Sequence, residues 1–483
     1  MLTKISLGLV ALAAVLLSGC DGLLVGGDGT PSPDGGFIAN PDAGANPPDG
    51  GSPPDGGADG GTDGGTTSSQ LPAPFDTNAT YSSTVYISPS GNNTTGNGSQ
   101  GSPYQSLSRA LSGAGPGLRV VMLPGTYPPQ GSLSNLTGSL ASPIKIEGQG
   151  SVIVDITGGT SAIHLQNPRY VVLENLDIRN SAVHGLNIDD AGSYDTPAEY
   201  VVLRNIRFSA IGSGGNNDCL KMSGVDRFYV TQSEFTGCNQ GEAIDMVGCH
   251  DGIVSGNFFH DMPGTAVQAK GGSADVMFHG NRFANIGVHS INLGGSTDPN
   301  LVRPITAPYE GERISAIGNV IEDAVLAPVA FLGCSDCVVA HNTIIRPLRW
   351  VARILLGSRD TYTVPSRQGW FINNIVYFRV ADISAYVNVG ASTQPETFTF
   401  GWNLWYATDN SGFSGPTWSG PPAEQSGVIQ QSPQFTNATG SDYRVPSTSP
   451  AVGAARDMPT GFTAYDFDGA LFDAPRTSGA LQP

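Results

Sequence analysis

Five charged or amide side chains fall at matching positions of an internal repeat, and their types could support acid–base chemistry. Aligning the repeats places Lys221, Asp245, Gln268 and Asn292 in one outward row, with Lys270 one step along the neighbouring row. Lysine is otherwise scarce, since the whole chain has only four. A lysine amine can act as a base when desolvation or a neighbouring cation lowers its pKa. The alternative interpretation is a solvated ion pair between adjacent strands, which contributes ~0–1 kcal/mol to stability.

Further acidic and histidine residues lie beside this row. Asp218 and Glu242 precede two of its members, and with Asp245 they could provide the two carboxylates that glycoside hydrolysis requires. His250 and His289 are also near, but no His-x-x-x-His or His/carboxylate spacing of a metal site occurs. We therefore interpret these histidines as turn or ladder residues and assign no metal ligand from the sequence itself.

The elements that must position these residues repeat at a fixed period. Phe235, Phe259 and Phe283 are 24 residues apart both times, and each closes a segment containing an apolar residue, two further positions and an Asn or Ser. A period of roughly 20–50 residues is typical of stacked supersecondary units. The polar position of this signature can be followed through Asn175, Asn205, Ser233, Asn257, Asn281, Asn319, Asn342, Asn374 and Asn403.

Short segments between these polar positions alternate apolar and polar residues, which is the pattern of β-strands; Leu220 to Met222 and Ile244 to Met246 are examples. Three short strands with tight turns fill about 24 residues, so each repeat is predicted to form one coil of a parallel β-helix. Stacked coils lie roughly 4.8 Å apart. At that spacing the recurring Asn side chains can form a hydrogen-bonded ladder.

The repeat and the Asn ladder resemble the right-handed parallel β-helix of the pectate-lyase-like superfamily, over roughly residues 80–480. The stretch from Val85 to Tyr127 resembles the start of such domains and includes a short helix over 102–111, which should cap the open end of the core. The segment after Asn403 resembles the closing segment that wraps the last coils. We therefore predict an all-β, single-domain right-handed parallel β-helix with an N-terminal capping helix and an internal Asn ladder.

The same resemblance implies a polysaccharide lyase, in which a Lys or Arg base takes the proton at C5 of a uronic acid. CLKMSG and VQAKGG resemble the Gly-ended strand that carries the catalytic Lys in one pectate-lyase family, and EAIDMVG resembles its calcium-ligand strand. The implied catalytic residues are Lys221 or Lys270 as the base, with Asp245. The implied cofactor is calcium, and a positively charged side chain is the alternative neutraliser of the substrate carboxylate.

Two Asn-to-Asn intervals are long, 38 residues from Asn281 to Asn319 and 32 from Asn342 to Asn374. Each therefore carries an inserted loop, and insertions in solenoids gather on one face, often the binding face. Both loops are rich in Arg and aromatic residues, so we expect them to wall a site for an extended, acidic polysaccharide. The predicted substrate-binding residues are Gln268, Asn292, Arg303 and Arg313.

Two other functions stay open at this point. One is a non-catalytic protein of the cell surface that acts in adhesion or carbohydrate binding. The other is a glycoside hydrolase that uses carboxylates beside the row. Nucleic acid is excluded as a partner, because a formal charge of −18 opposes phosphate binding.

The first part of the chain predicts export. Residues 1–20 combine Lys4, an apolar run too short to span a membrane and the sequence Leu-Ser-Gly-Cys, which resembles a bacterial lipoprotein signal with lipidation at Cys20. Residues 21–78 are rich in Gly, Pro and Asp and predict a disordered linker, and residues 79–483 are the predicted β-helix domain. We expect a monomer anchored by lipid to a bacterial membrane, outside the cytoplasm.

Five cysteines besides Cys20 lie in the predicted domain. An exported protein can oxidise them, but an odd number leaves at least one free, and the sequence does not specify the pairing. The five are Cys219, Cys238, Cys249, Cys334 and Cys337. For the last two, a local disulfide or buried thiols are favoured over a metal or redox motif.

Overall fold

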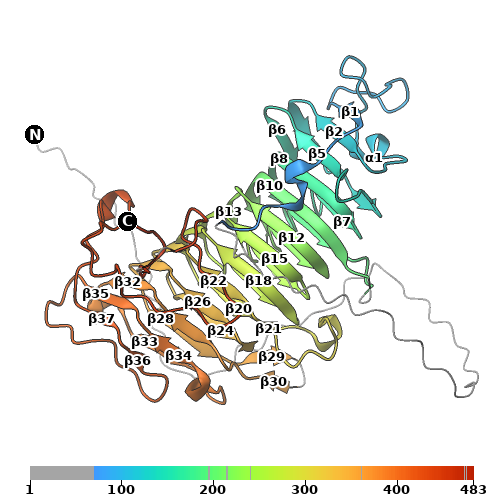
Figure 1. Cartoon of the computed structure of the whole chain (residues 1–483). Coiled ribbons are helices and arrows are strands. Elements are labelled where there is room, and N and C mark those ends of the chain that lie inside the picture. The colour runs from blue at the N-terminus through green and yellow to red at the C-terminus, as the bar shows by residue number, and fades with distance from the viewer. Residues whose placement is uncertain are drawn as a thin grey trace, which may run out of the picture. The chain divides into compact units, whose positions relative to one another are not determined.

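The computed structural model describes residues 70–193, 196–213, 216–239, 241–359, 362–472, 474 and 476–483. These residues wind into a solenoid of about 11 turns that consists almost entirely of parallel β-strands (Figure 1). The predicted all-β solenoid is therefore confirmed. The predicted signal peptide, the lipidated Cys20 and residues 21–69 of the predicted linker lie outside the described residues, so the three segment boundaries stay predictions.

The sheet that carries the predicted site has ten parallel strands. In order of pairing they are β4 (Ser132–Ser134), β7 (Ile163–Gln166), β9 (Leu186–Asp189), β11 (Leu220–Ser223), β14 (Ile244–Val247), β17 (Val267–Lys270), β20 (His289–Gly294), β24 (Ala327–Leu332), β28 (Trp350–Leu355) and β33 (Ala385–Val389). Each strand pairs with the equivalent strand of the next coil, and the whole set is called the ten-stranded sheet below.

The remaining parallel strands form a 25-stranded sheet, called the large sheet below. Its strands are β1 (Ser83–Ile87), β2 (Leu118–Met122), β3 (Gly125–Tyr127), β5 (Ile144–Gly148), β6 (Val152–Asp155), β8 (Arg169–Ser181), β10 (Ala198–Ile211), β12 (Val225–Thr231), β13 (Glu234–Cys238), β15 (His250–Ser255), β16 (Phe258–Met262), β18 (Ser273–His279), β19 (Arg282–Ile286), β21 (Gly311–Glu312), β22 (Ser315–Ile317), β23 (Val320–Glu322), β25 (Cys334–Ser335), β26 (Val338–Ala340), β27 (Thr343–Ile345), β31 (Trp370–Ile372), β32 (Ile375–Phe378), β34 (Thr399–Gly401), β35 (Leu404–Ala407), β36 (Glu424–Gln425) and β37 (Val428–Ile429). One antiparallel hairpin, β29 (Gly357–Arg359) and β30 (Tyr362–Val364), extends from the second insertion.

Helical structure is slight. The short helices are α1 (Leu107–Ala110), η1 (Phe75–Asn78), η2 (Pro299–Leu301), η3 (Val380–Asp382), η4 (Pro395–Thr397) and η5 (Ala438–Gly440). Among the described residues, none of these helices has the length and hydrophobicity needed to cross a membrane.

The core is built by the period-2 pattern and by stacking of equivalent residues. In β11, Leu220 and Met222 are buried, while Lys221 and Ser223 are half-buried on the other side of the strand. Phe235, Phe259 and Phe283, which revealed the repeat, stack ring on ring with centroids 4.8 and 4.9 Å apart. These distances match the spacing of neighbouring strands, as coil-on-coil stacking requires.

The predicted Asn ladder is present inside the solenoid. The Nδ2 atom of Asn257 donates to Oδ1 of Asn281 at 3.0 Å, and Asn281 donates likewise to Asn319 at 3.1 Å. The same contact continues through Asn342, Asn374 and Asn403. Ser233 starts this buried ladder, because its backbone N–H donates to Oδ1 of Asn257 at 2.9 Å.

The ladder differs from the prediction at its N-terminal end. Asn175 and Asn205 adopt positive φ angles of 62° and 51° and bond to each other at 2.8 Å at an exposed bend. In register, Ser233 stands opposite Ile206, whose N–H donates to the Ser233 hydroxyl at 3.1 Å. These two Asn residues therefore lie one position too early to join the buried ladder, and they form a separate pair outside it.

Segments outside the coils cover the N-terminal end of the solenoid and part of the large sheet. Leu107 and Ala110 of α1 are buried with the core at the N-terminal end, as the predicted cap requires, although the helix is shorter than 102–111. Side chains of the C-terminal segment pack over the large sheet, where Tyr443 belongs to a cluster with Val320 and Ile345. Residues 70–78 also contact the β-helix, since Asp76 pairs with Arg204 at 2.7 Å.

Two disulfides resolve the cysteine pairing. Cys219 bonds to Cys238 and Cys334 bonds to Cys337, which confirms a local bond in the CxxC segment. Cys249 is free and fully buried, and its burial raises the pKa of the thiol to about 12. Such a thiol is inert at neutral pH.

Candidate functional site

The register of the ten-stranded sheet places the predicted residues side by side. Lys221 pairs with Asp245, Asp245 with Gln268, and Gln268 with Asn292. The same register continues beyond the prediction to Ala330, Arg353 and Asn388. The residues from Lys221 to Asn388 at this position are called the central row below. Lys270 lies two residues after Gln268 and pairs with Val247 in the neighbouring row, as predicted.

The central row is far less exposed than a solvated surface would be. Asp245 has no exposed area, and Gln268 and Asn292 are each 5 % exposed. The side chains of Lys221 and Lys270 keep 16 % and 13 % of their exposure. Part of the cover comes from the first insertion, because the position of Gly295 lies directly against the stem of Lys270. The solvated ion pair is therefore the wrong description of these charges.

Asp245 is the centre of a buried charge network. Its Oδ2 accepts from Lys221 Nζ, and its Oδ1 accepts from Gln268 Nε2 at 2.8 Å and lies 3.4 Å from Lys270 Nζ. Burial opposes ionisation of Asp245, but Lys270 and Lys221 outweigh it, so the pKa of Asp245 lies below its ordinary value.

Lys221 is held between two carboxylates. Besides its bond to Asp245, its Nζ lies 3.5 Å from Oδ2 of Asp218, which has no exposed area. Burial lowers the pKa of Lys221, but attraction to Asp245 and Asp218 outweighs burial and leaves that pKa above its ordinary value. Lys221 therefore stays protonated and serves as the counter-charge of the cluster.

Three residues lead into these strands, each three positions before a member of the central row: Asp218, Glu242 and His289. Carboxylate oxygens of Asp218, Glu242 and Asp245 all lie within 4.8 Å of one another. Asp218 Oδ2 and Glu242 Oε2 are buried and accept no hydrogen bond among the described residues. Burial, together with the charges of Asp245 and Asp218, raises the pKa of Glu242 to about 9.

This oxygen-only donor set fits a hard cation such as calcium, which prefers carboxylate and carbonyl ligands. Asp218 Oδ2 and Glu242 Oε2 accept no hydrogen bond among the described residues, and the Glu242 carboxyl is also held in its protonated form by its neighbours; both features would be relieved by a divalent ion. The calcium that the resemblance implied is thus compatible with Asp218, Glu242 and Asp245. The resemblance to a calcium-ligand strand had pointed first to Asp245, with Glu242 and Asp218 as further positions.

A hollow of about 420 Å³ opens beside Lys221 on the N-terminal side of the row. Its polar lining includes His184, Asn187, Asp189, Asp190 and Arg303. Lys221 is the member of the charge network that lines this hollow. The hollow has room for part of an extended ligand next to Lys221.

The two loop arginines predicted to bind substrate are both engaged by the protein. Arg303 lines the hollow beside Lys221, but it donates to both carboxylate oxygens of Asp226, at 2.8 and 3.0 Å. Arg313 pairs with Asp275 and Glu312 and lines another hollow on the large sheet. The structure does not bring Arg313 to the row, because Glu312 belongs to β21, which pairs with β18 of the large sheet.

A buried ion pair joins the two insertions beside the central row. Arg359 Nε donates to Glu310 Oε1 at 2.7 Å, and the two side chains are 1 % and 0 % exposed. Glu310 Oε2 also accepts from Thr297 at 2.7 Å and from the Gly271 N–H at 3.0 Å, next to Lys270. The predicted loops thus lie together beside the C-terminal end of β17.

The site contains residues that sequence reasoning missed. Arg353 of β28 stands in the central row, and its Nη1 donates to His289 Nε2 at 3.2 Å. The repeat itself was the available signal, because Arg353 follows Ala330 by 23 residues, close to one period. The long interval from Asn342 to Asn374 obscured this period, because the sequence does not show where the inserted loop begins.

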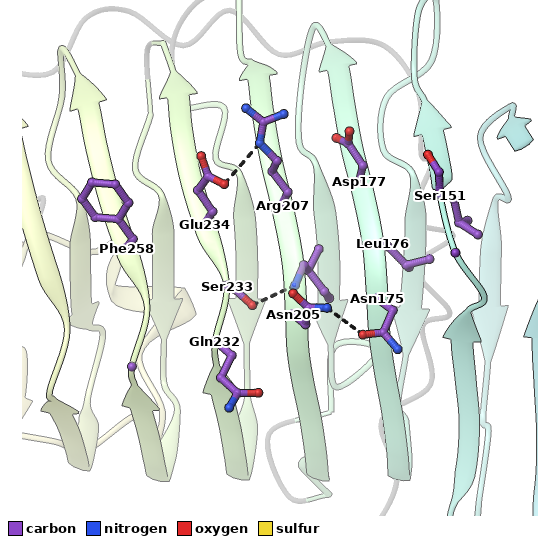
Figure 2. A pocket seen from close by; sticks show the side chains of 14 residues that line it. Ser151, Asn175, Leu176, Asp177, Asn205, Arg207, Gln232, Ser233, Glu234 and Phe258 are labelled. Carbon is purple, nitrogen blue, oxygen red and sulfur yellow. Dashed lines mark hydrogen bonds and ion pairs between the residues drawn. The ribbon is translucent and has the colours of Figure 1, made fainter. Parts of the chain in front are cut away.

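A second concave surface, of about 520 Å³, lies on the large sheet (Figure 2). Its charged groups are Asp177, Arg207 and Glu234, and Arg207 Nε lies 3.3 Å from Glu234 Oε2. Phe258 forms part of the same surface. No lysine lines this surface, so the paired lysines of the ten-stranded sheet remain the better candidate for chemistry.

Comparison with known proteins supports the fold. The family model described as "Right handed beta helix region" matches residues 194–347. The chain is similar to a crystal structure of the pectate lyase Pel9A, with 16% identity, TM-score 0.49, and coverage of 84% of this chain and 97% of that chain. A sequence search of curated proteins finds no match.

Two further solved structures share the architecture. An alginate lyase from Paenibacillus sp. str. FPU-7 has 13% identity, TM-score 0.40, and coverage of 62% of this chain and 95% of that chain. A GH136 lacto-N-biosidase from Eubacterium ramulus has 12% identity, TM-score 0.39, and coverage of 68% of this chain and 67% of that chain. The protein is a right-handed parallel β-helix, as predicted, and likeness at these identities concerns the fold alone.

Proposed function

We propose that the protein is a polysaccharide lyase that binds an acidic polysaccharide along the ten-stranded sheet and cleaves it by β-elimination. The observation that carries the proposal is the network around Asp245, where two of the four lysines of the chain meet a buried carboxylate beside an open hollow. A protein that only binds sugar has no need for buried, mutually compensating charges. Perturbed groups of this kind are typical of catalytic sites.

Lys270 is the proposed base. Two buried carboxylates hold Lys221 in its protonated form, whereas the one carboxylate that pairs with Lys270 among the described residues is that of Asp245, at 3.4 Å. In the reaction, the neutral Lys270 amine takes the C5 proton of a uronate. The C–H electron pair forms the C4–C5 double bond, the C4–O glycosidic bond breaks, and the leaving oxygen takes a proton from water.

Charge balance in the network favours a cation-assisted reaction. With Glu242 protonated, the charges of Asp218 and Asp245 are balanced by Lys221 and Lys270. Loss of a proton from Lys270 then leaves the cluster negative. Calcium held by Asp218, Glu242 and Asp245 would supply the compensating charge and neutralise the substrate carboxylate.

Hydrolysis is less well supported by the same geometry. The carboxyl groups of glycosidases are roughly 5–5.5 Å apart in retaining enzymes and roughly 6.5–9.5 Å apart in inverting ones. Here the oxygens of Asp218, Glu242 and Asp245 lie within 4.8 Å, and the Lys221 ammonium contacts both Asp218 and Asp245. These carboxylates are therefore engaged with one another and with Lys221 rather than placed on two sides of a glycosidic bond.

The remaining parts of the proposal concern location. Lipidation at Cys20 would anchor the protein to a bacterial membrane, outside the cytoplasm, and residues 21–69 would tether the β-helix to the anchor. The protein would act there as a monomer on polysaccharide of the surroundings. Mass spectrometry of the N-terminal peptide from native membranes would test this, since an unmodified Cys20 contradicts the anchor.

The test of the activity is to incubate the purified protein with pectate, alginate and glycosaminoglycans, with calcium or with a chelator. We expect ultraviolet absorbance of an unsaturated uronate to grow with at least one of these substrates, and to depend on calcium. Reducing ends without this absorbance would indicate a hydrolase, and neither signal would indicate a non-catalytic binding or adhesion protein.

Variants assign the base. Lys270→Met should lower kcat by roughly 10²–10⁴-fold, the usual contribution of a general base. Lys145→Met is the matched control, because Lys145 is as little exposed as Lys221 and also contacts two carboxylates, but lies on the large sheet. Full activity in Lys270→Met would show that the base is assigned wrongly.

A further inference from the structure

Arg353 differs from most arginines of the β-helix in having no counter-charge. Its Nε donates to Oδ1 of Asn388 at 2.9 Å and its Nη1 donates to His289, and it forms no ion pair with a carboxylate in the described part of the chain. Burial and repulsion from Arg349 lower the pKa of Arg353 to about 10, so it is still charged at neutral pH. A half-buried cation is therefore held beside a second cation.

The side chains that accept hydrogen bonds from the Arg353 guanidinium are neutral. Burial and the charge of Arg353 lower the pKa of His289 to about 3, so its ring carries no charge and accepts the hydrogen bond from Arg353. Asn292, the neighbour of His289, has a buried Oδ1 without a hydrogen-bond partner among the described residues. The described residues thus provide polar contacts to Arg353 but no carboxylate that pairs with it.

An aromatic ring holds the two arginines in place. The guanidinium carbons of Arg349 and Arg353 each lie 4.2 Å from the centroid of the Trp350 ring. Cation–π contacts stabilise a guanidinium without neutralising it, and they leave its edge free for a planar oxyanion. In a chain with a net charge of −18, two such cations side by side are a local exception.

The position of Arg353 relates it to the proposed chemistry. It lies in the central row three strands beyond Gln268, by way of Asn292 and Ala330. With strands roughly 4.8 Å apart, this separation is about 14 Å. Ala330 contributes only a methyl group, so no long side chain of the row stands between Asn292 and Arg353. Gln268 and Asn292 are each 5 % exposed and Ala330 is buried, so a sugar chain that reaches from the lysines to Arg353, a few rings away, would pass over the covered part of the row.

We propose that Arg353, supported by Arg349 and Trp350, is a distal subsite that binds a carboxylate of the polysaccharide several rings from the cleaved bond. This inference rests on the proposed function for the identity of the ligand. It defines the substrate as a chain with uronate carboxylates beyond the reacting ring. It also moves substrate recognition from the loop residues Arg303 and Arg313, which are already paired, to a strand.

The test is the binding of oligogalacturonates of increasing length to the purified protein, measured by isothermal titration calorimetry in chelator to suppress turnover. Arg353→Gln should weaken binding of long oligomers by roughly 10–100-fold, as expected for loss of one charge-assisted hydrogen-bonded contact. Oligomers too short to reach from the lysines to Arg353 should bind wild type and variant equally. Carboxyl-reduced oligomers should also show no difference.

Arg207→Gln serves as the matched control. Arg207 is an exposed arginine on the concave surface of the large sheet, so the change in net charge is the same while the ten-stranded sheet is untouched. Unchanged affinity of Arg353→Gln for long oligomers, or an equal loss in Arg207→Gln, would overturn the inference. If Arg353→Gln weakens the binding of dextran sulfate but not the binding of oligogalacturonate, the assignment of Arg353 to a carboxylate is overturned.

The outcomes separate this inference from the proposed function. If binding depends on Arg353 but the wild type forms no product in calcium, the proposed lyase activity is contradicted and the proposed subsite is supported. Product formation whose KM and kcat do not change in Arg353→Gln would keep the lyase and contradict the subsite. No binding of any uronate by the wild type would contradict the subsite as well.

Discussion

Replacing Lys221 with methionine should destabilise the β-helix far more than the same change at Lys270. Methionine keeps a long apolar stem but removes the ammonium that contacts Asp245 and lies 3.5 Å from Asp218. Both carboxylates have no exposed area, and removing one partner of a buried ion pair costs ~3–5 kcal/mol. Within the described part of the chain, Lys270 forms an ion pair with Asp245 alone, at 3.4 Å, and Asp245 keeps Lys221 as its partner when Lys270 is replaced. Lys270→Met should therefore cost on the order of 1 kcal/mol.

The pH dependence gives this prediction a second readout. The lysines hold the pKa of Asp245 below its ordinary value, so ionised Asp245 stabilises the fold above its unfolded pKa of about 4, and this contribution is lost as pH falls through the folded pKa. In Lys221→Met, the Asp245 carboxylate can bind a proton, which removes the negative charge that Lys221 no longer neutralises. The stability difference between wild type and variant should therefore be largest near neutral pH and shrink towards pH 4.

Guanidinium chloride unfolding, followed by circular dichroism, measures both effects through the transition midpoint. Adding Asp245→Asn to Lys221→Met should recover part of the lost stability, because it removes a buried charge that has lost its main partner. Equal destabilisation by Lys221→Met and Lys270→Met would refute the assignment of Lys221 as the counter-charge. So would a difference between wild type and Lys221→Met that does not change between neutral and acidic pH.

Two other predictions concern the carboxyl cluster and the ladder. The pKa of Glu242 is raised in the folded protein from its ordinary value of 4.5 to about 9, so the contribution of Glu242 to stability falls as pH rises between these values. Glu242→Gln should flatten this slope in thermal melts, and an unchanged slope would contradict the assigned pKa. Asn281→Ala removes side-chain hydrogen bonds to Asn257, Asn319 and the Val254 carbonyl, and leaves buried groups unpaired. It should cost ~2–4 kcal/mol in the same unfolding assay. Asn285→Ala, at an exposed position of β19, should cost less, about 1 kcal/mol, because it loses one exposed hydrogen bond and places Ala at a positive φ of 55°.

The repeat made most of the fold predictable. The 24-residue spacing of Phe235, Phe259 and Phe283 reports stacking that the rings confirm at 4.8 and 4.9 Å. The prediction of the Asn ladder was wrong only where one extra residue separates the Asn from the following apolar residue. Asn205 is followed by two residues before Phe208, whereas Asn257 is followed by one before Phe259, and that single shift moves the side chain from the interior to the bend.

The candidate site was predictable in position but not in environment. Period-2 alternation within a 24-residue repeat suffices to align Lys221, Asp245 and Gln268, because both regularities are local. Burial of Asp245 depends on turns and loops from other coils, which no local pattern reports. Arg313 was misplaced for the same reason, since the path of a long insertion depends on tertiary contacts such as the Glu310–Arg359 pair.

The most direct test of the central claim is the mass of the products formed from a uronate polymer in heavy-oxygen water. Elimination adds no water, so the account predicts products whose masses sum to that of the substrate. It also predicts that Lys270→Met forms none of these products. Products whose masses sum to that of the substrate plus one heavy-oxygen water for each bond cleaved would show hydrolysis and contradict the account.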